Sequence, residues 1–308
     1  MWSIETLEWI DIELTSFCNI KCKGCFREQT HHKEILNKEY ITLETIKEKF
    51  QKEYFPSIKI INFCGSIDEP TSHPQFFEII EHFADWNAHI NIATNGSTRT
   101  TDWWKHLASI LPKSHAVTWG IDGSDELSEV YRVGSNFKKV EQNYRAFINA
   151  GGKAVWQFIE FEHNQHQTEI ARQKASDEGF NKFTTIISHR KDTKDIVHKK
   201  EHVEELPTIE CKYANQKRIF VNHLGDVIPC CHLNAKSLEY SITQKVQDKF
   251  EEIFQQGNNL KNKSIKQAIT GNVFTDIIES WTSDNKIPRC IQACKQNKRD
   301  KFNKEKLK

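Results

Sequence analysis

The sequence has almost no net charge, no long apolar run and no secretory start. Its 43 lysines and arginines balance 42 aspartates and glutamates, which leaves a formal charge of +1 at pH 7. This balance argues against a surface built wholly to hold nucleic acid or anionic lipid. The apolar runs fall well short of the ~18 residues of a membrane span. The first eight residues carry acids early, unlike a signal peptide. We therefore expect a soluble, cytoplasmic protein with no membrane or nucleic-acid partner.

The chain nevertheless has ample material for a folded core. It is 308 residues long and contains eight tryptophans and 19 phenylalanines, too many for a disordered chain. A chain of this length buries roughly 75% of the surface that it exposes when unfolded, so it needs no disulfides to fold. No internal repeat or low-complexity segment is apparent. Length alone allows one large domain or two ordinary ones.

The nine cysteines are grouped instead of scattered. Cys18, Cys22 and Cys25 lie close together, and Cys64 stands alone. The other five lie in the last third of the chain: Cys211, Cys230, Cys231, Cys290 and Cys294. Because the cytosol keeps thiols reduced, such groups are typical of zinc or iron–sulfur ligands. We expect Cys64 to be a buried, apolar cysteine.

The first cysteine group supplies three thiols and leaves a fourth ligand position open. Closed zinc sites take four ligands, and no further cysteine follows Cys25 for nearly forty residues. Three thiolates on a four-iron cluster would leave one iron free for a ligand that is not protein. His31 or His32 could instead complete a zinc site, so zinc stays open as an alternative.

Apolar periodicity predicts alternating strands and helices from residue 8 to residue 188. The expected strands are Glu8–Leu14, Ile58–Phe63, His89–Ala93, Ala116–Ile121, Ala154–Phe161 and Phe183–Ile187. The expected helices are Leu43–Glu53, Pro74–Ala84, Asp102–Ile110, Phe137–Ala150 and Thr168–Glu178. Six strands separated by helices imply parallel pairing with right-handed crossovers, in an open doubly wound sheet or a partial barrel.

Polar motifs follow the first four predicted strands. The Cys18 group follows the first, Gly65–Pro70 the second, Thr94–Gly96 the third and Asp122-Gly123 the fourth. In parallel barrels the carboxyl ends of the strands meet at one face and carry the chemistry. The pattern therefore predicts one shared site.

The motifs Cys18-x3-Cys22-x2-Cys25, Gly65-Ser-Ile-Asp-Glu-Pro70 and Thr94-Asn-Gly96 together resemble the radical S-adenosylmethionine superfamily. The resemblance implies an α/β fold with a partial (β/α)6 barrel like a TIM barrel. It implies that the three cysteines hold a 4Fe–4S cluster, whose open iron binds the amino and carboxylate groups of S-adenosylmethionine.

The same resemblance implies cofactor-binding roles for seven further residues. Gly65, Asp68, Glu69 and Pro70 would surround the amino group of S-adenosylmethionine, and Thr94 and Asn95 would lie beside its ribose and methionine portions. Arg132 would pair with its carboxylate through a bidentate contact. The chain departs from the family pattern at Ile67 and Asp68, where glycines are common. It departs again at Gly120, where a small hydroxyl residue is usual.

The C-terminal third resembles the SPASM/twitch extension that holds an auxiliary cluster in such enzymes. Residues 219–230 read as a hairpin around a Leu-Gly-Asp turn. The resemblance implies a second 4Fe–4S cluster on Cys211, Cys230, Cys290 and Cys294, with Cys231 as the spare cysteine that could replace one of the four. Four thiolates also suit zinc, which remains the alternative. We expect a core domain over residues 1–205 and a small cysteine-rich α+β extension with a basic tail over 206–308.

The resemblance implies an enzyme that reductively cleaves S-adenosylmethionine. The resulting 5′-deoxyadenosyl radical would abstract hydrogen from a substrate, and we expect oxidative modification of a peptide or protein. An external one-electron reductant of the flavodoxin or ferredoxin type would supply the electron. One alternative is a dehydrogenase of small sugar-like alcohols from the same superfamily. Another is a non-catalytic iron–sulfur or zinc module that senses redox state. The sequence assigns no further catalytic residue.

Overall fold

The computed structural model of the chain describes residues 2–29, 36–64, 67–187, 209–234, 257–283, 286–287, 290–291, 294 and 303–306. Six parallel strands form its framework, each paired with the next in sequence. They are β1 (Trp9–Ile12), β2 (Ile60–Phe63), β3 (His89–Thr94), β4 (Ala116–Gly120), β5 (Ala154–Glu160) and β6 (Lys182–Ile187). The predicted α/β fold with six parallel strands is confirmed.

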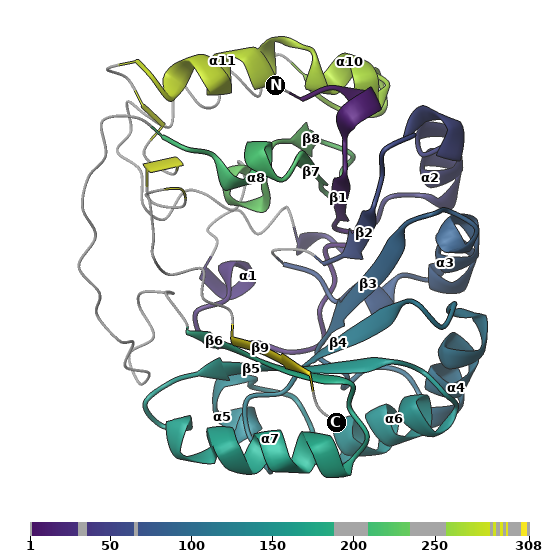
Figure 1. Ribbon diagram of the computed structural model, residues 1–308, viewed down its shortest axis with the longest axis vertical. Coiled ribbons are helices and arrows are strands. Elements are labelled where there is room, and N and C mark those ends of the chain that lie inside the picture. The colour runs from purple at the N-terminus through teal and green to yellow at the C-terminus, as the bar shows by residue number, and fades with distance from the viewer. Residues whose placement is uncertain are drawn as a thin grey trace.

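Helices between these strands cover the convex outer side of the curved sheet (Figure 1). They are α2 (Leu43–Lys49), α3 (Phe76–Ala84), α4 (Thr101–Ile110), α6 (Phe137–Asn149) and α7 (Thr168–Asp177). The predicted helix over 43–53 ends earlier, at Lys49, because Phe50 leaves helical geometry and is fully buried. A separate 3-10 turn, η3 (Lys52–Tyr54), follows it.

The C-terminal region continues the same sheet. Strand β7 (Arg218–Val221) pairs in parallel with β1, and β8 (Val227–Ile228) returns antiparallel to β7. The predicted hairpin is therefore confirmed, and Gly225 supplies the positive φ of its turn. Strand β9 (Asn303–Lys306) pairs antiparallel with β6. The order is β8-β7-β1-β2-β3-β4-β5-β6-β9, and in the described residues the two edge strands do not meet, so the barrel is open.

Short elements complete the fold. The short helices are α1 (Phe26–Gln29), α5 (Ser128–Tyr131), α8 (Lys212–Asn215), α10 (Ile265–Ile269) and α11 (Asn272–Ser280). The remaining 3-10 turns are η1 (Ile4–Thr6), η4 (Pro70–Ser72), η5 (Gln165–Gln167) and η6 (Cys231–Leu233). None of the helices in the described ranges is both long and apolar enough to cross a membrane.

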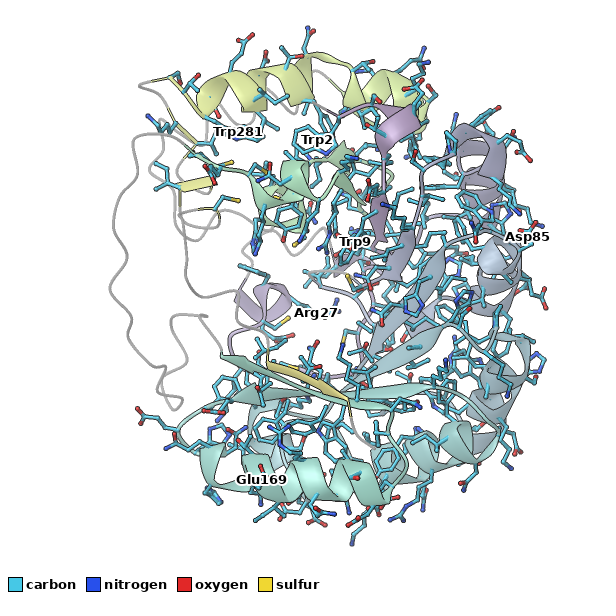
Figure 2. The ribbon with its side chains drawn as sticks, viewed as in Figure 1. Trp2, Trp9, Arg27, Asp85, Glu169 and Trp281 are labelled. Atoms are coloured by element: carbon cyan, nitrogen blue, oxygen red, sulfur yellow. The ribbon has the colours of Figure 1, made fainter. Side chains whose placement is uncertain are left out.

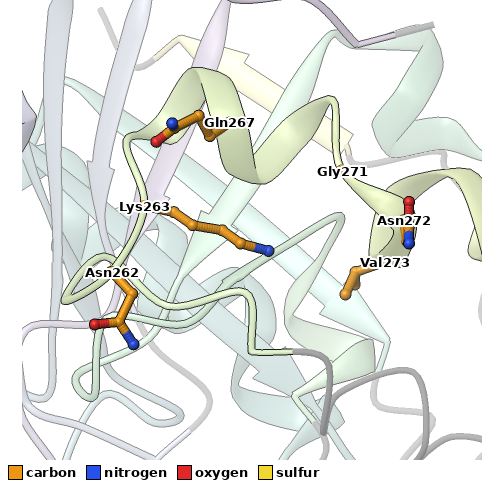
Figure 3. Close-up of a pocket in the computed structure, with 6 residues that line it drawn as sticks. All are labelled: Asn262, Lys263, Gln267, Gly271, Asn272 and Val273. Carbon is orange, nitrogen blue, oxygen red and sulfur yellow. The ribbon is translucent and has the colours of Figure 1, made fainter.

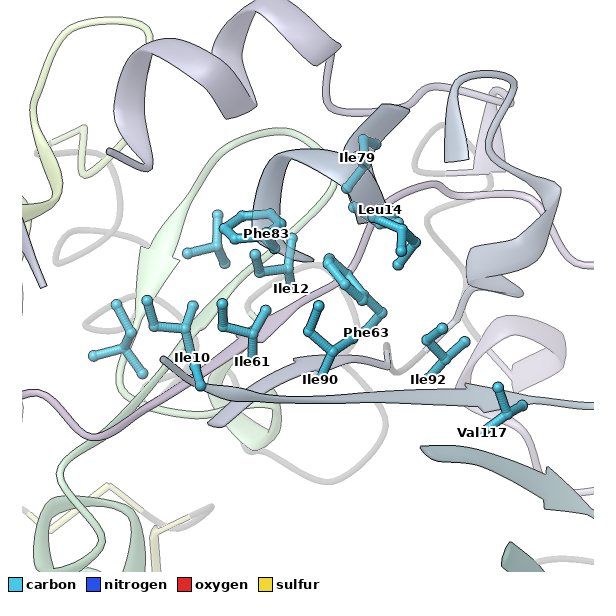
Figure 4. Packing of buried hydrophobic residues seen from close by; sticks show 14 of the residues in the cluster. Ile10, Ile12, Leu14, Ile61, Phe63, Ile79, Phe83, Ile90, Ile92 and Val117 are labelled. Atoms are coloured by element: carbon cyan, nitrogen blue, oxygen red, sulfur yellow. The ribbon is translucent and has the colours of Figure 1, made fainter. Parts of the chain in front are cut away.

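The outer face of the sheet is apolar and packs against the helices (Figure 4). Alternate strand residues such as Ile12, Phe63 and Ile92 are fully buried there, with Ile79 and Phe83 of α3 packed over them. One apolar cluster spans both predicted domains, because Trp2 packs edge-on against Phe274 of α11 at 5.1 Å. The proposed boundary near residue 205 itself lies outside the described residues.

The inner face of the sheet is polar instead. The amide of Asn62 donates to Asp11 at 2.8 Å, and the amide of Asn91 donates to Asn62. Thr118 donates to Asn91 at 2.7 Å, and Arg218 pairs with Asp11 from the other side. These side chains form a hydrogen-bonded row from β7 to β4. The barrel interior is thus built from partnered polar groups, as buried polar atoms require.

Candidate functional site

The cysteine loop follows β1 and crosses the inner side of the barrel. Its last part is a tight turn, in which the Cys25 N–H donates to the Cys22 carbonyl at 3.1 Å and Gly24 adopts a φ of +72°. Helix α1 begins directly after Cys25 and lies inside the curve of the sheet (Figure 1). Cys18, Cys22 and Cys25 are all half-buried thiols.

The three thiols interact with one another. Burial is the main cause that raises the pKa of Cys18, and the neighbouring Cys22 and Cys25 raise it further. A desolvated thiol of this kind needs a metal to carry it as the thiolate. His31 and His32, the ligands of the zinc alternative, lie outside the described residues.

The donor set fits a four-iron cluster. Cys18, Cys22 and Cys25 present three thiols on one loop. Thiolates are the soft ligands that hold iron–sulfur clusters.

Glu69 joins the loop after β2 to β3 and to the cysteine loop. Its buried carboxylate accepts hydrogen bonds from the Thr71 and Thr94 hydroxyls, both at 2.6 Å, and from the Asn95 N–H at 2.7 Å. Burial raises the pKa of Glu69, and these three donors oppose the rise. Glu69 in turn raises the pKa of Cys18, so the carboxylate and the thiol lie within electrostatic range. A desolvated carboxylate here is suited to an ammonium partner.

The other predicted residues of the 65–70 loop have different surroundings. Gly65 lies outside the described residues. The Asp68 carboxylate accepts the Leu14 N–H at 3.1 Å, so it ties the loop to the end of β1. Pro70 is buried and begins η4. In the described part of this loop, Glu69 is the residue that the structure brings to the Cys18 thiol.

Asn95 contacts the cysteine loop directly. Its Nδ2 lies 3.7 Å from the Cys18 Sγ and 2.9 Å from the Asn19 Oδ1. Its Oδ1 accepts from the N–H and the hydroxyl of Ser97, at 2.8 and 2.7 Å. The Asn19 amide closes the network by donating to the Ser97 hydroxyl at 2.8 Å. Asn19 and Ser97 were not predicted, although each stands beside a motif residue.

Arg132 approaches the same site from the segment after β4. Its Nε lies 2.8 Å from the Asp122 Oδ2, and both side chains are largely buried. Burial lowers the pKa of Arg132, but Asp122 and Cys22 raise it more, so the net shift is upward. A Cβ at Gly120 would stand 2.6 Å from the Arg132 Nη2. The glycine that departs from the family pattern therefore provides the space for this guanidinium.

Arg27 of α1 is a site residue that sequence reasoning missed. Figure 2 shows it on the inner side of the barrel. Its guanidinium donates to the Ser16 carbonyl and, at 3.4 Å, to the Ile67 carbonyl. It thereby joins the cysteine loop to the loop after β2. Sequence offers no signal for this, because an arginine two residues after a cysteine has no defined partner until the barrel forms.

Four C-terminal cysteines gather in a second, fully buried group (Cys211, Cys230, Cys290 and Cys294). A hydrogen bond with Cys294 and burial raise the pKa of Cys211. Burial and Cys294 raise the pKa of Cys290 to about 12. Burial also raises the pKa of Cys230, and the neighbouring Cys231, Cys290 and Cys294 raise it further.

Cys231 has partners outside this group. Its sulfur lies 3.8 Å from the Tyr213 hydroxyl, and Asp11, Arg218 and Glu13 also act on its pKa. Burial raises the pKa of Cys64, and Asp11 and Cys231 contribute to that rise. Because Cys231 also acts on the pKa of Cys230, the assignment of the other four cysteines to one centre stays a prediction.

A groove in the C-terminal region lies apart from these residues. It has a cavity volume of about 760 Å³ and lies where α10 gives way to α11 (Figure 3). Its lining consists of Asn262, Lys263, Gln267, Gly271, Asn272 and Val273. None of the predicted site residues lines it.

Comparison with family models divides the chain in two. Residues 12–160 match the model described as the radical SAM superfamily. Residues 211–296 match SPASM, described as an iron–sulfur cluster-binding domain. The two ranges contain the two cysteine groups.

One curated relative is the tungsten-containing aldehyde ferredoxin oxidoreductase cofactor-modifying protein of Pyrococcus furiosus. It is 32% identical over 104 residues, which are 34% of this chain and 28% of the relative. The match therefore spans less than a third of that protein.

Two solved structures share the fold. Streptococcus suis SuiB bound to the precursor peptide SuiA has a TM-score of 0.59 at 11% identity, covering 92% of this chain and 66% of SuiB. Native anSMEcpe with bound AdoMet and the Cp18Cys peptide has a TM-score of 0.60 at 15% identity, covering 90% of this chain and 84% of that one. At such low identities the likeness establishes the fold alone.

Proposed function

This chain belongs to the radical S-adenosylmethionine superfamily and carries a SPASM iron–sulfur domain, and we propose that it oxidatively modifies a peptide or protein substrate. As a radical SAM enzyme it uses 4Fe–4S clusters and S-adenosylmethionine. The observation that carries the proposal is the meeting of Glu69 and Asn95 with the Cys18 thiol at the carboxyl ends of the barrel strands.

The residues of the first site divide the work of holding the cofactors. Cys18, Cys22 and Cys25 would hold the cluster, and Glu69 would hold the ammonium of S-adenosylmethionine. Arg132 would pair with its carboxylate, as its burial and its nearness to Cys22 allow. When bound, these cofactors supply a 5′-deoxyadenosyl radical that abstracts a hydrogen atom from the substrate.

The protein's own contribution is orientation. Three donors fix the Glu69 carboxylate, so it need not reorganise when the ammonium arrives. The Asp122 carboxylate and the space at Gly120 hold the Arg132 guanidinium. Arg27 ties the loops that carry Cys18 and Glu69 together. Groups fixed in this way would hold a reactive cofactor in one orientation.

The second site supports an oxidation that needs an electron acceptor. The four buried cysteines, Cys211, Cys230, Cys290 and Cys294, would hold an auxiliary cluster, with Cys231 left over. We also propose a flavodoxin or ferredoxin as the external reductant. The nine cysteines of the chain suit the reducing cytoplasm in which such carriers work.

The choice of a peptide or protein substrate rests on the structural neighbours. SuiB was solved with the precursor peptide SuiA, and anSMEcpe with the Cp18Cys peptide. The Pyrococcus furiosus relative favours a second candidate, modification of a cofactor, because that protein is named as a cofactor-modifying protein. A substrate identified by transfer of deuterium into 5′-deoxyadenosine would separate the two.

Anaerobic reconstitution tests the proposal. We expect about eight irons per chain, four for each cluster, and formation of 5′-deoxyadenosine when dithionite and S-adenosylmethionine are added. The matched variant Cys18→Ala should make none. Reconstituted wild-type protein that binds iron but cleaves no S-adenosylmethionine would contradict the proposal and favour a non-catalytic redox module.

A further inference from the structure

The side-chain amide of Asn95 has one orientation that its partners dictate. Nitrogen and oxygen of an asparagine amide look alike, so their assignment depends on hydrogen bonds. Here one amide atom lies 2.8 Å from the backbone N–H of Ser97, which can only donate. That atom must be the oxygen, and the Ser97 hydroxyl donates to it as well. The nitrogen of Asn95 therefore faces the other way, toward the Cys18 sulfur and the Asn19 Oδ1.

This contact is partly shielded from water. Asn95 and Ser97 are each 6% exposed, and Cys18 is half-buried. A hydrogen bond is stronger in such surroundings than in water, since the local dielectric is low. The N–H of Ile20 also hydrogen-bonds Cys18 and lowers its pKa, which opposes the rise caused by burial and by Glu69. Both donors stabilise negative charge on this sulfur.

We propose that Asn95 is a positioning residue that donates a hydrogen bond to the Cys18 sulfur and thereby raises the reduction potential of the cluster at this site. The inference rests on the proposed function, because it takes Cys18 as a cluster ligand. Reduction adds negative charge to a cluster, and donors aimed at its sulfurs stabilise that charge. The Thr94-Asn-Gly96 turn would thus contact the cluster ligand Cys18 as well as S-adenosylmethionine.

Two variants remove the donor. Asn95→Leu keeps the approximate size of the side chain and removes the N–H. Asn95→Asp keeps the shape and removes the N–H, and it adds a negative charge that should lower the potential further. The matched control is Asn143→Leu, since the buried Asn143 amide donates to the Gly96 and Thr98 carbonyls of the same turn. This control loosens the turn and leaves the Asn95 donor in place.

The measurement is a redox titration followed by electron paramagnetic resonance on the reconstituted full chain, with iron content determined for each sample. The signal of the first cluster is the one that S-adenosylmethionine perturbs. We expect its midpoint potential to be more negative in both Asn95 variants than in the wild type, and unchanged in Asn143→Leu.

Two results would overturn this inference and leave the proposed function standing. One is an Asn95→Leu protein with full iron content and the wild-type potential. The other is an equal shift in Asn143→Leu, which would mean that the turn and not the donor sets the potential. Wild-type protein without any signal that responds to S-adenosylmethionine would overturn the inference together with the proposed function.

Discussion

The two cysteine groups are built in opposite ways. Cys18, Cys22 and Cys25 come from one short loop and are half-buried, and they number three. Cys211, Cys230, Cys290 and Cys294 come from distant segments and are fully buried, and they number four. An open group with a missing ligand can take a further molecule at the metal. A closed group with all four ligands cannot, so it suits storage of an electron or stability of the fold.

The surroundings of the two groups follow the same division. Glu69, Asn95 and Arg132 act on the cysteines of the first group, and each comes from the loop after a different barrel strand. At the second group the cysteines act mainly on one another, together with burial. Polar side chains that converge from several strand ends are typical of a reaction site in a parallel barrel. The comparison shows that two features together distinguish the reacting centre: an incomplete set of cysteine ligands and polar side chains from several strand ends.

Removal of a thiol from the open group should have the largest effect. Cys18→Ala is expected to abolish 5′-deoxyadenosine formation, because the cluster that must receive S-adenosylmethionine loses one of its three protein ligands. The iron content should fall by about four per chain, which leaves the second cluster in place. Iron and sulfide analysis with product detection by mass spectrometry checks both. A fall to zero iron would contradict the comparison, since it would show that the second cluster cannot form without the first.

Removal of a thiol from the closed group should spare the first reaction step. Cys290→Ala is expected to lose about four irons and to lower the melting temperature. The same variant should still form 5′-deoxyadenosine. Cys231→Ala is the matched control, because its sulfur contacts the Tyr213 hydroxyl and Cys231 is the cysteine left out of the assignment. It should keep about eight irons; loss of iron in this control would show that Cys231 is a ligand.

Sequence patterns could predict the first group because its parts are local. A loop with three closely spaced thiols after an apolar strand is visible in the sequence, and so are the motifs at the ends of the next strands. The sequence could not show that Gly120 makes room for Arg132, that Asp68 binds the Leu14 N–H or that Arg27 joins two loops. Each of these contacts joins residues that only the folded barrel brings together.

The second group was harder to predict for the same physical reason. Its cysteines could be counted, but which of five would be left over depends on the direction of one side chain at η6. Likewise the hairpin of β7 and β8 follows from its turn residues, whereas the parallel pairing of β7 with β1 does not. Local sequence patterns determine where strands and helices form. Which strands pair with each other depends on contacts between residues far apart in the sequence.

Glu69→Gln should sharpen the comparison by weakening only the first centre. The Gln amide nitrogen can donate to the Thr71 and Thr94 hydroxyls while its oxygen accepts the Asn95 N–H, so the local network survives. Loss of the charge should weaken binding of S-adenosylmethionine by about 10- to 100-fold, the usual range for a hydrogen bond to a charged group. Equilibrium binding to the reconstituted protein measures this. Iron content should stay at the wild-type value.

The same variant carries a pH signature. The pKa of Glu69 is raised on folding, so the folded state holds this proton more tightly than the unfolded state. Stability from this group is therefore present at low pH and is lost as the pH rises through the raised pKa. Glu69→Gln removes that loss, so without S-adenosylmethionine it should melt higher than the wild type at pH 7 and equally at acidic pH. A variant that melts lower at pH 7 would show that the ionised carboxylate is fully compensated by its three donors.

The smallest change, a single methyl group, tests whether the space at Gly120 serves the first centre. In Gly120→Ala the new Cβ would meet the Arg132 Nη2 at 2.6 Å, so the guanidinium must move away from its place beside Asp122. We expect a loss of about 1–3 kcal/mol in the free energy of unfolding and about tenfold weaker binding of S-adenosylmethionine. Gly271→Ala is the control in the other region, because its Cβ would lie 3.1 Å from the Gln267 carbonyl and its φ is ordinary for alanine. If only Gly120→Ala binds S-adenosylmethionine more weakly, Arg132 contributes to cofactor binding at the first cysteine group. Equal binding in both variants and the wild type would mean that this arginine only pairs with Asp122 and supports the fold.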